Sequence, residues 1–191
     1  MIRDEFYWIT QINKASVVVN RRCGLLDEAT AKLAAYGIDK VQKEAQDDPA
    51  KRVKRYIDYE PMLIAATSPA VTLLHAGRSS QDILSTMRVA ILREQTLQLA
   101  RALDDVIEKL LSLAQAHRDT MVPNYTNGVA AQPNSYAHYL LGFVAALLRD
   151  RERISQCLVR YNDGGDGTKW NGLALRPRSD GNVFGLFRPA A

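Results

Sequence analysis

From Ser79 to Val122 the sequence contains neither glycine nor proline, and this stretch constrains the possible folds more than any other feature. Apolar residues recur along it at intervals of three and four, which is the spacing of one helix face. The members of this first stripe are Ile83, Met87, Ala90, Leu97, Ala100, Leu103, Ile107, Leu110 and Ala114. The stripe predicts one helix from about residue 80 to His117, about 55 Å long at 1.5 Å per residue.

A second apolar stripe lies on a neighbouring face of the same predicted helix. It consists of Leu84, Ile91, Leu99, Val106 and Leu113. A helix with two apolar faces must be covered on more than one side, so this helix belongs inside a bundle.

Another long helix is predicted from Tyr136 to about Tyr161, after an irregular loop between Pro123 and Pro133. Asn134 or Ser135 can cap its first turn. Two long helices with broad apolar faces cannot cover each other, so either more chain or more subunits must complete the bundle. We therefore expect association through the helix that carries Ile83–Ala114.

The part of the chain before residue 79 is also predicted to be helical, and no convincing alternating strand is visible. We predict a first helix over residues 9–22 and a second, capped by Asp27, that runs to about residue 45. Pro49 opens a further helix, and Pro61 and Pro69 interrupt the segment after it. These patterns predict an all-α chain.

The helical patterns divide the chain into three regions. Residues 1–78 form an N-terminal helical region, residues 79–162 form the long helices, and residues 163–191 form an irregular tail rich in glycine, arginine and asparagine. The composition, 47% hydrophobic and 24% charged, is typical of globular proteins. No apolar run approaches the roughly 20 residues that cross a bilayer.

Cysteine usage and the N-terminus favour the cytoplasm. The first ten residues are charged and aromatic, unlike a secretory signal. We expect Cys23 and Cys157 to be reduced, partly buried thiols. The basic run Lys51–Arg55 has no accompanying nucleic-acid motif, so we interpret it as a solvated helix start. No nucleic-acid or membrane partner is expected.

Polar residues gather directly before the first long helix, in the order His75-Ala76-Gly77-Arg78-Ser79-Ser80-Gln81-Asp82. Gly77 permits a tight turn, and the amides that open a helix favour an anion. Arg78 adds a charge that can hold a carboxylate. On periodicity alone, however, a capping serine beside a surface arginine explains this segment more simply.

The second polar segment, Tyr125-Thr126-Asn127 through Ala131-Gln132-Pro133, lies between the two long helices. Thr126, Asn127 and Gln132 can exchange hydrogen bonds with a ligand. Loops held by rigid helices often carry function. An ordinary turn built on Asn-Gly and Gln-Pro is an equally good explanation of the segment alone.

Taken together, the two segments resemble motifs of argininosuccinate lyases, which belong to the fumarase/aspartase superfamily. The first resembles that family's His-Thr-Gly-Arg-Ser-Arg-Asn-Asp stretch. The second resembles its Gly-Tyr-Thr-His-Leu-Gln-x-Ala-Gln-Pro stretch. The order of the motifs and the long helix between them match, and Ala15-Ser16 to Gly24-Leu25-Leu26 is similar to the family's early helix and turn. The resemblance covers roughly residues 9–162.

The resemblance implies an incomplete long-helix bundle and a C–N lyase that releases fumarate from a succinyl compound without a metal or cofactor. It also implies a homotetramer. Site roles carried over by matched position give substrate binding to Arg78, Ser79, Ser80, Gln81, Thr126 and Gln132. Thr126 and Asn127 would lie closest to the chemistry, and His75 would serve structure or substrate. His117 and His138 match no motif.

Three departures qualify the implied substrate. Asn127 stands where the family has a histidine associated with proton transfer, and Gln81 replaces an asparagine. The family's catalytic serine loop has no counterpart up to residue 191. We therefore expect an N-terminal portion of an argininosuccinate lyase-like enzyme, inactive or weakly active alone. The alternatives are a catalytically dead assembly partner and an unrelated helical scaffold. A frameshift near residues 166–172 would explain the tail.

Overall fold

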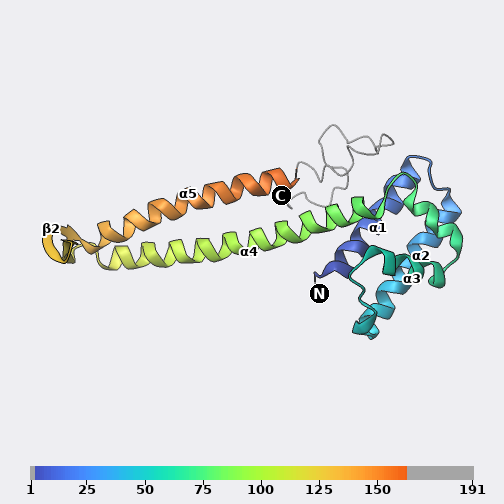
Figure 1. The fold of residues 1–191 in the computed structure, drawn as a ribbon, viewed down its shortest axis with the longest axis horizontal. Helices are drawn as coiled ribbons and strands as arrows, with labels where there is room; N and C mark the ends of the chain where they lie inside the picture. The colour runs from blue at the N-terminus through green and yellow to red at the C-terminus, as the bar shows by residue number, and fades with distance from the viewer. Residues whose placement is uncertain (1–2, 163–191) are drawn as a thin grey trace. The chain divides into compact units, whose positions relative to one another are not determined.

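The computed structural model describes residues 3–162, and the predicted tail and frameshift lie outside these residues. Helices dominate the described part of the chain, which confirms the all-α class (Figure 1). The elements in order are α1 (Glu5–Arg22), α2 (Glu28–Asp47), the 3-10 helix η1 (Pro49–Lys51), α3 (Tyr56–Ala66), the 3-10 helix η2 (Pro69–His75), α4 (Ser80–Ala116), β1 (Met121–Thr126), β2 (Val129–Ser135) and α5 (Tyr136–Asn162).

Two compact units divide the chain. The first contains Met1–Arg93 and the second contains Glu94–Arg160, so α4 contributes its first turns to one unit and its remaining turns to the other. The long helix predicted from the first apolar stripe is thus confirmed as a single continuous element.

The first helix begins earlier than predicted because Asp4 caps it. The Asp4 carboxylate accepts a hydrogen bond from the Tyr7 amide at 3.0 Å and pairs with Arg52 at 2.6 Å. The Arg52 guanidinium also lies over the Phe6 ring, 4.8 Å from its centroid. The prediction of a solvated helix start at Lys51–Arg55 holds for Lys51, Lys54 and Arg55, which are exposed, with Arg55 at the N-cap position of α3. It is wrong for Arg52, which pairs with Asp4 at the start of α1.

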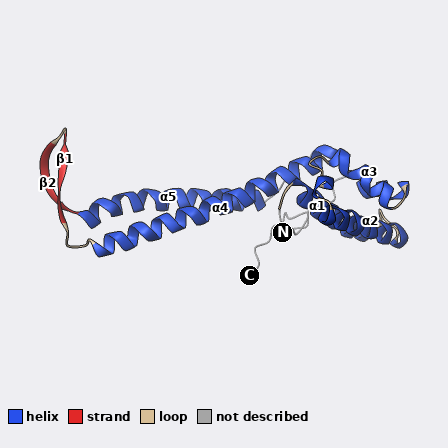
Figure 2. Ribbon diagram, turned by 90° about the horizontal axis from the view of Figure 1, so that it is seen from below, coloured by secondary structure: helices blue, strands red, loops and turns tan. Residues whose placement is uncertain are grey.

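The predicted cap of the second helix is confirmed. The Asp27 carboxylate accepts from the Thr30 amide at 2.7 Å, and the helix continues to Asp47. α2 lies beside α1 (Figure 2). Together with α3, η2 and the first turns of α4, these helices enclose two hydrophobic clusters. Large, fully buried members of these clusters include Phe6, Ile9, Ile12, Ile38, Tyr59, Leu63, Leu74 and Ile83.

Close packing of α2 against α3 depends on Gly37. A Cβ atom at this position would meet Thr67 Cγ2 at 2.5 Å and Leu63 Cδ1 at 2.9 Å. We expect Gly37→Ala to lower the free energy of unfolding by about 1–3 kcal/mol, because overpacking outweighs the gain in helix propensity. Gly142→Ala in α5 is the matched control, since nothing lies within 4 Å of its added Cβ. Urea unfolding followed by circular dichroism measures both, and an unchanged or raised stability of Gly37→Ala would contradict this prediction.

Two local predictions fail. Pro61 lies inside α3 instead of interrupting it, because a helix can continue past a proline when the surrounding packing compensates for the lost hydrogen bond. Cys23 and Cys157 are free thiols, but both are exposed, not partly buried. Cys23 directly follows the last turn of α1, and Cys157 stands on the solvent side of α5.

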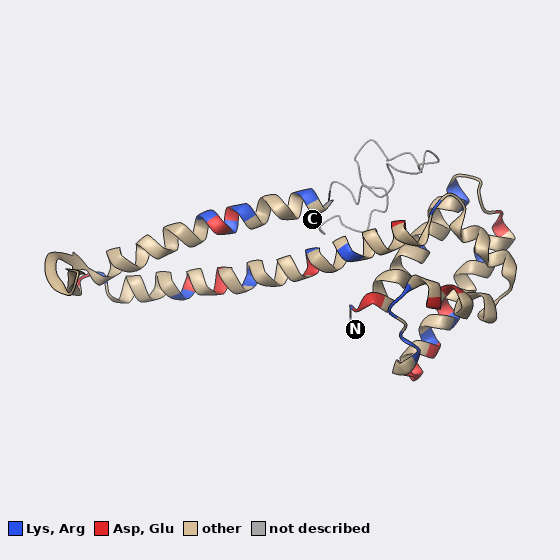
Figure 3. Cartoon of the chain, in the orientation of Figure 1, with Lys and Arg blue, Asp and Glu red and all other residues tan. Residues whose placement is uncertain are grey.

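In the second unit the later turns of α4 and the whole of α5 up to Arg160 run side by side (Figures 1 and 2). Ala114, Ala137 and Leu140 form its small core, and Arg151 Nε donates to Asp104 Oδ1 at 2.7 Å across the helix pair. Basic and acidic residues are interspersed along α4, whereas the charges of α5, also of both signs, lie in its C-terminal half (Figure 3). No helix among the described residues is long and apolar enough to span a membrane.

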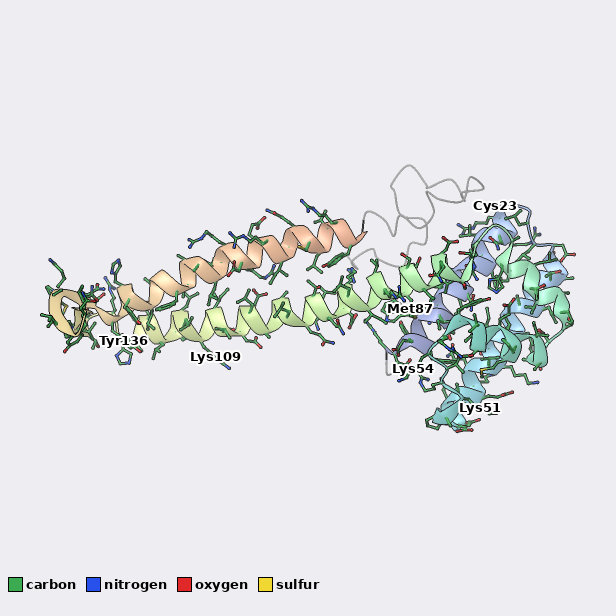
Figure 4. All side chains as sticks on the ribbon, viewed as in Figure 1. Cys23, Lys51, Lys54, Met87, Lys109 and Tyr136 are labelled. Carbon is green, nitrogen blue, oxygen red and sulfur yellow. The ribbon has the colours of Figure 1, made fainter. Side chains whose placement is uncertain are left out.

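The second apolar stripe has two different fates. Leu84 and Ile91 are half-buried against the core of the first unit, where Met87 of the first stripe also packs (Figure 4). Leu99, Val106 and Leu113 are 58%, 46% and 39% exposed. We call these three residues, spaced seven apart, the outer seam. The seam leaves α4 with an uncovered apolar face within the described chain.

The segment predicted as an irregular loop is a β-hairpin, so that prediction is wrong. Its strands pair antiparallel, with Thr126 opposite Val129 and a bulge between Asn124 and Tyr125. Asn127 and Gly128 have φ values of 50° and 77°, which suits a two-residue turn that needs two left-handed residues. At the end of β2 the Ser135 hydroxyl accepts from the amide of His138 at 3.1 Å, which confirms Ser135 as the cap of α5.

Candidate functional site

The first polar segment forms a tight turn that leads into α4. Gly77 has a φ of 77°, a left-handed conformation that favours glycine. The Arg78 amide donates to the His75 carbonyl at 3.1 Å and closes the turn. This turn decides where the first residues of α4 lie.

Arg78 directs its guanidinium into the first unit, toward α1. Nη2 donates to Asn13 Oδ1 at 2.7 Å, and Nη1 donates to the Ser16 hydroxyl. Nε lies 3.2 Å from His75 Nδ1. Burial lowers the pKa of Arg78 to about 10, and the nearby Asp82 and Glu60 carboxylates act in the opposite direction. The side chain therefore remains charged at neutral pH while being surrounded by protein.

His75 is held as a neutral imidazole. Its Nδ1 lies 3.0 Å from the Tyr56 hydroxyl and 2.9 Å from Arg78 Nη2. An arginine can only donate, so Nδ1 is the acceptor and the proton is on Nε2. Burial and, secondarily, the Arg78 charge lower the pKa of His75 to about 3. This histidine is consequently unable to gain a proton near neutral pH.

The low pKa of His75 makes the first unit sensitive to acid. In the unfolded chain the imidazole has its ordinary pKa of 6.5, so between this value and about 3 the unfolded state binds more protons. The contribution of His75 to the free energy of unfolding is therefore fully present above pH 6.5. It falls as the pH is lowered, by up to about 1.4 kcal/mol per pH unit. Urea unfolding of the wild type and of His75→Gln at pH 7, 6 and 5 measures it. Equal pH dependence in the two proteins would contradict the assignment.

Ser79 and Asp82 close the start of α4 with a capping arrangement. The Ser79 amide donates to Asp82 Oδ2 at 2.7 Å, and the Ser79 hydroxyl lies 3.2 Å from the same oxygen. The structure thus shows Ser79 in capping contacts at this helix start. Ser80 is half-buried and Gln81 is exposed, so the third and fourth predicted substrate-binding residues of this segment remain reachable from solvent.

The second polar segment is the exposed hairpin of the second unit. Thr126 ends β1 and pairs with Val129, while Asn127 begins the turn. Gln132, opposite Asn124, contributes to a shallow cavity of about 290 Å³ on the hairpin. The residues lining this cavity are Met121, Val122, Pro123, Ala130, Ala131, Gln132 and Pro133.

The six predicted substrate-binding residues therefore fall into two groups, one in each unit. Arg78, Ser79, Ser80 and Gln81 belong to the first unit, and Thr126 and Gln132 belong to the second. His117 and His138 take part in local contacts beside the hairpin, with Thr120 and Asn134 respectively. Among the described residues no group of histidine, cysteine, aspartate and glutamate could hold a metal ion.

Sequence reasoning missed the polar side chains of α1 that face the turn. Asn13, Ser16 and Asn20 are buried, with at most 2% of their surface exposed. Besides the contacts with Arg78, the Asn20 amide donates to the Leu74 carbonyl at 2.9 Å. Their spacing of three and four places them on one face of the helix. The polar residues at this helical spacing were the signal in the sequence. A buried polar face of a helix, however, has the same sequence pattern as a solvent-exposed one.

The chain is similar to known lyases in sequence and in fold. The family model described as lyase matches residues 8–178. An argininosuccinate lyase of Anoxybacillus flavithermus is 31% identical over 152 residues, which are 78% of this chain and 33% of that protein. An argininosuccinate lyase of a Synechococcus species is 33% identical over 74% of this chain and 31% of its own length. The chain thus spans about a third of the length of these curated relatives.

Solved structures show the same relationship. EDDS lyase in complex with formate superposes with a TM-score of 0.76 at 28% identity, covering 82% of this chain and 31% of that one. A fumarate lyase from Mesorhizobium sp. BNC1 superposes with a TM-score of 0.70 at 18% identity, over 92% of this chain and 44% of that one, which supports the fold alone. With its helical fold and two motif segments, the chain belongs to the lyase family and is an argininosuccinate lyase-like member of the fumarate lyase superfamily.

Proposed function

We propose that this chain is part of a C–N lyase that eliminates an amine from an N-substituted aspartate and releases fumarate. Argininosuccinate, cleaved to arginine and fumarate, is the default substrate. The observation that carries the proposal is the pairing of two motif segments with the long helix α4 between them, in a chain whose relatives include argininosuccinate lyases. Gln81 and Asn127 depart from the motifs, which leaves room for another N-substituted aspartate.

The chemistry requires a proton to be removed beside a carboxylate. This step becomes feasible when fixed donors stabilise the negative charge that develops on that carboxylate. Ser80 and Gln81 can supply hydroxyl, amide and backbone donors at the start of α4, where the helix dipole favours an anion. Ser79 would join them when a bound carboxylate displaces Asp82 from the Ser79 amide and hydroxyl. Thr126 would donate to the carboxylate of the succinyl group, and Gln132 would position the substrate or the hairpin.

The proton-accepting group lies outside these motif segments. Asn127 carries an amide, which has no basic lone pair to accept a proton. His75 is neutral, but its Nδ1 is occupied by Arg78 and Tyr56. The role proposed for this chain is therefore carboxylate binding within a larger assembly. We propose that this assembly acts in the cytoplasm and uses no cofactor, metal, nucleic acid or membrane partner. A catalytically dead assembly partner is the second candidate, favoured by Asn127.

A titration of the isotope-labelled chain with fumarate tests the proposal. We expect saturable amide shifts at Ser79–Gln81 and around Thr126–Gln132 in NMR spectra. Thr126→Val removes the hydroxyl without changing the shape of the side chain, and should weaken binding by about tenfold, the effect of one lost hydrogen bond to a charged group. Val129→Thr adds a hydroxyl at the paired position of the hairpin and serves as the matched control. Shifts confined to other residues, or none at millimolar fumarate, would contradict the proposal and favour the assembly partner.

A further inference from the structure

The side chain of Arg78 is committed to contacts inside the first unit. Its guanidinium meets three groups, namely Asn13 Oδ1 at 2.7 Å, the Ser16 hydroxyl and His75 Nδ1 at 2.9 Å. A planar fork with five N–H donors suits three acceptors at different angles, which a lysine ammonium on a flexible stem does not reproduce. Little of this guanidinium is left to contact a substrate.

The partners of Arg78 are themselves rigidly placed. Asn13 and Ser16 belong to α1 and are 0% and 2% exposed. Ser16 also donates to the carbonyl of Ile12 at 2.8 Å, so its hydroxyl oxygen remains available as the acceptor for Arg78. One helical turn further on, Asn20 holds the Leu74 carbonyl at 2.9 Å. One face of α1 thus forms hydrogen bonds with Leu74 before the turn at Gly77 and with Arg78 after it.

His75 extends this network to α3. Its ring stacks edge-on against Tyr56, with centroids 4.7 Å apart, and its Nδ1 faces both the Tyr56 hydroxyl and Arg78. The turn is therefore fastened to two helices of the same unit through side chains. The backbone that emerges from it leads through Ser79 into the first turn of α4, which carries Ser80 and Gln81.

We propose that Arg78 is a positioning residue: its guanidinium fastens the His75–Ser79 turn to α1 and thereby sets the place and direction of the Ser79–Gln81 donors, without touching the substrate. That those donors bind a substrate carboxylate rests on the proposed function. That Arg78 fastens the turn to α1 is independent of the proposed function. The positive charge of Arg78 is also near the Asp82 carboxylate, which caps the same helix start.

The experiment separates the geometry of the guanidinium from its charge. Hydrogen exchange of the full chain is measured for residues 76–82 in the wild type, Arg78→Lys, Arg78→Met and Asn13→Leu. We expect the exchange rate in this segment to rise about tenfold or more in all three variants, because the segment opens more easily when the contacts of Arg78 with α1 are lost. Arg88→Met, which removes an exposed arginine on the same helix, should leave the segment unchanged.

Fumarate affinity supplies the readout that a merely structural role would not move. Asn13 is buried in α1 and is no part of the proposed site, yet Asn13→Leu should weaken fumarate binding to the same degree as Arg78→Lys. A substrate-binding arginine predicts the opposite pattern, in which Arg78→Lys keeps much of the affinity and Asn13→Leu keeps all of it. That pattern, or unchanged exchange in Arg78→Lys, would overturn the proposal.

Two further outcomes are decisive. If the wild type binds no fumarate, the proposed function fails, while the exchange data alone still decide whether Arg78 fastens the turn. If Arg78→Met does not fold, the milder Ser16→Ala decides, since it removes one acceptor and should raise exchange at residues 76–82 by a smaller factor. If Ser16→Ala and Asn13→Leu, each measured separately, both exchange residues 76–82 at the wild-type rate, the proposal that Arg78 fastens the turn is overturned.

Discussion

The purified chain is expected to release fumarate from argininosuccinate at least about 10²-fold more slowly than a full-length argininosuccinate lyase, because loss of a general base typically costs about 10² to 10⁴ in rate. The structure gives the physical reason. Asn127 at the hairpin turn cannot accept a proton, and the Nδ1 lone pair of His75 is already engaged by Arg78 and Tyr56. The motif segments can bind a carboxylate without supplying a base.

Absorbance at 240 nm follows the fumarate formed, and the argininosuccinate lyase of Anoxybacillus flavithermus is a suitable positive control. A second N-substituted aspartate should be assayed alongside, since Gln81 lengthens one side chain of the motif. Turnover by this chain within tenfold of the control would mean that a residue of this chain acts as the base, and would contradict the expected loss of activity.

Charging the outer seam of α4 should convert an assembled protein into a monomer. Leu99 and Val106 are 58% and 46% exposed although each is an apolar residue at a seven-residue interval. Burying each such side chain contributes about 1.5–3 kcal/mol, and burying an unpaired lysine ammonium costs more than that. We expect Leu99→Lys combined with Val106→Lys to weaken self-association by at least about 10²-fold.

Sedimentation velocity across a range of concentrations measures this change. Gln115→Lys adds one lysine, half the charge of the double variant, at an exposed position of α4 about half a helical turn around from the seam, and should leave association intact. Circular dichroism of the double variant at low temperature distinguishes a helical monomer from an unfolded chain. An unaltered oligomer in the double variant would exclude the outer seam as the contact surface.

Long elements of the fold were predictable because their patterns repeat over many turns. The first stripe, from Ile83 to Ala114, predicts α4 almost to its ends, since a glycine- and proline-free run leaves the helix no place to stop. The hairpin was missed for the opposite reason. Pro123 and Pro133 stand opposite each other in the two strands and removed the strand signal, because proline within a strand-like run argues against a strand.

The candidate site was predictable only in part. The motif residues Ser79–Gln81 and Thr126 could be named from the sequence, but the internal role of Arg78 could not. An arginine in a polar segment has the same appearance whether its charge points to solvent or into the protein. The deciding partners, Asn13 and Ser16, lie more than sixty residues earlier in the chain and become neighbours only on folding.

The most direct test of the proposed assembly is the mass of the unmodified chain in solution. If α4 and α5 form one part of a lyase-type helical bundle, only other copies can cover their remaining apolar faces when this chain is alone in solution. Light scattering at micromolar concentration should therefore give a single species whose mass is a whole-number multiple, two or more, of the 21.3 kDa chain. A monodisperse monomer of 21.3 kDa under the same conditions would contradict it.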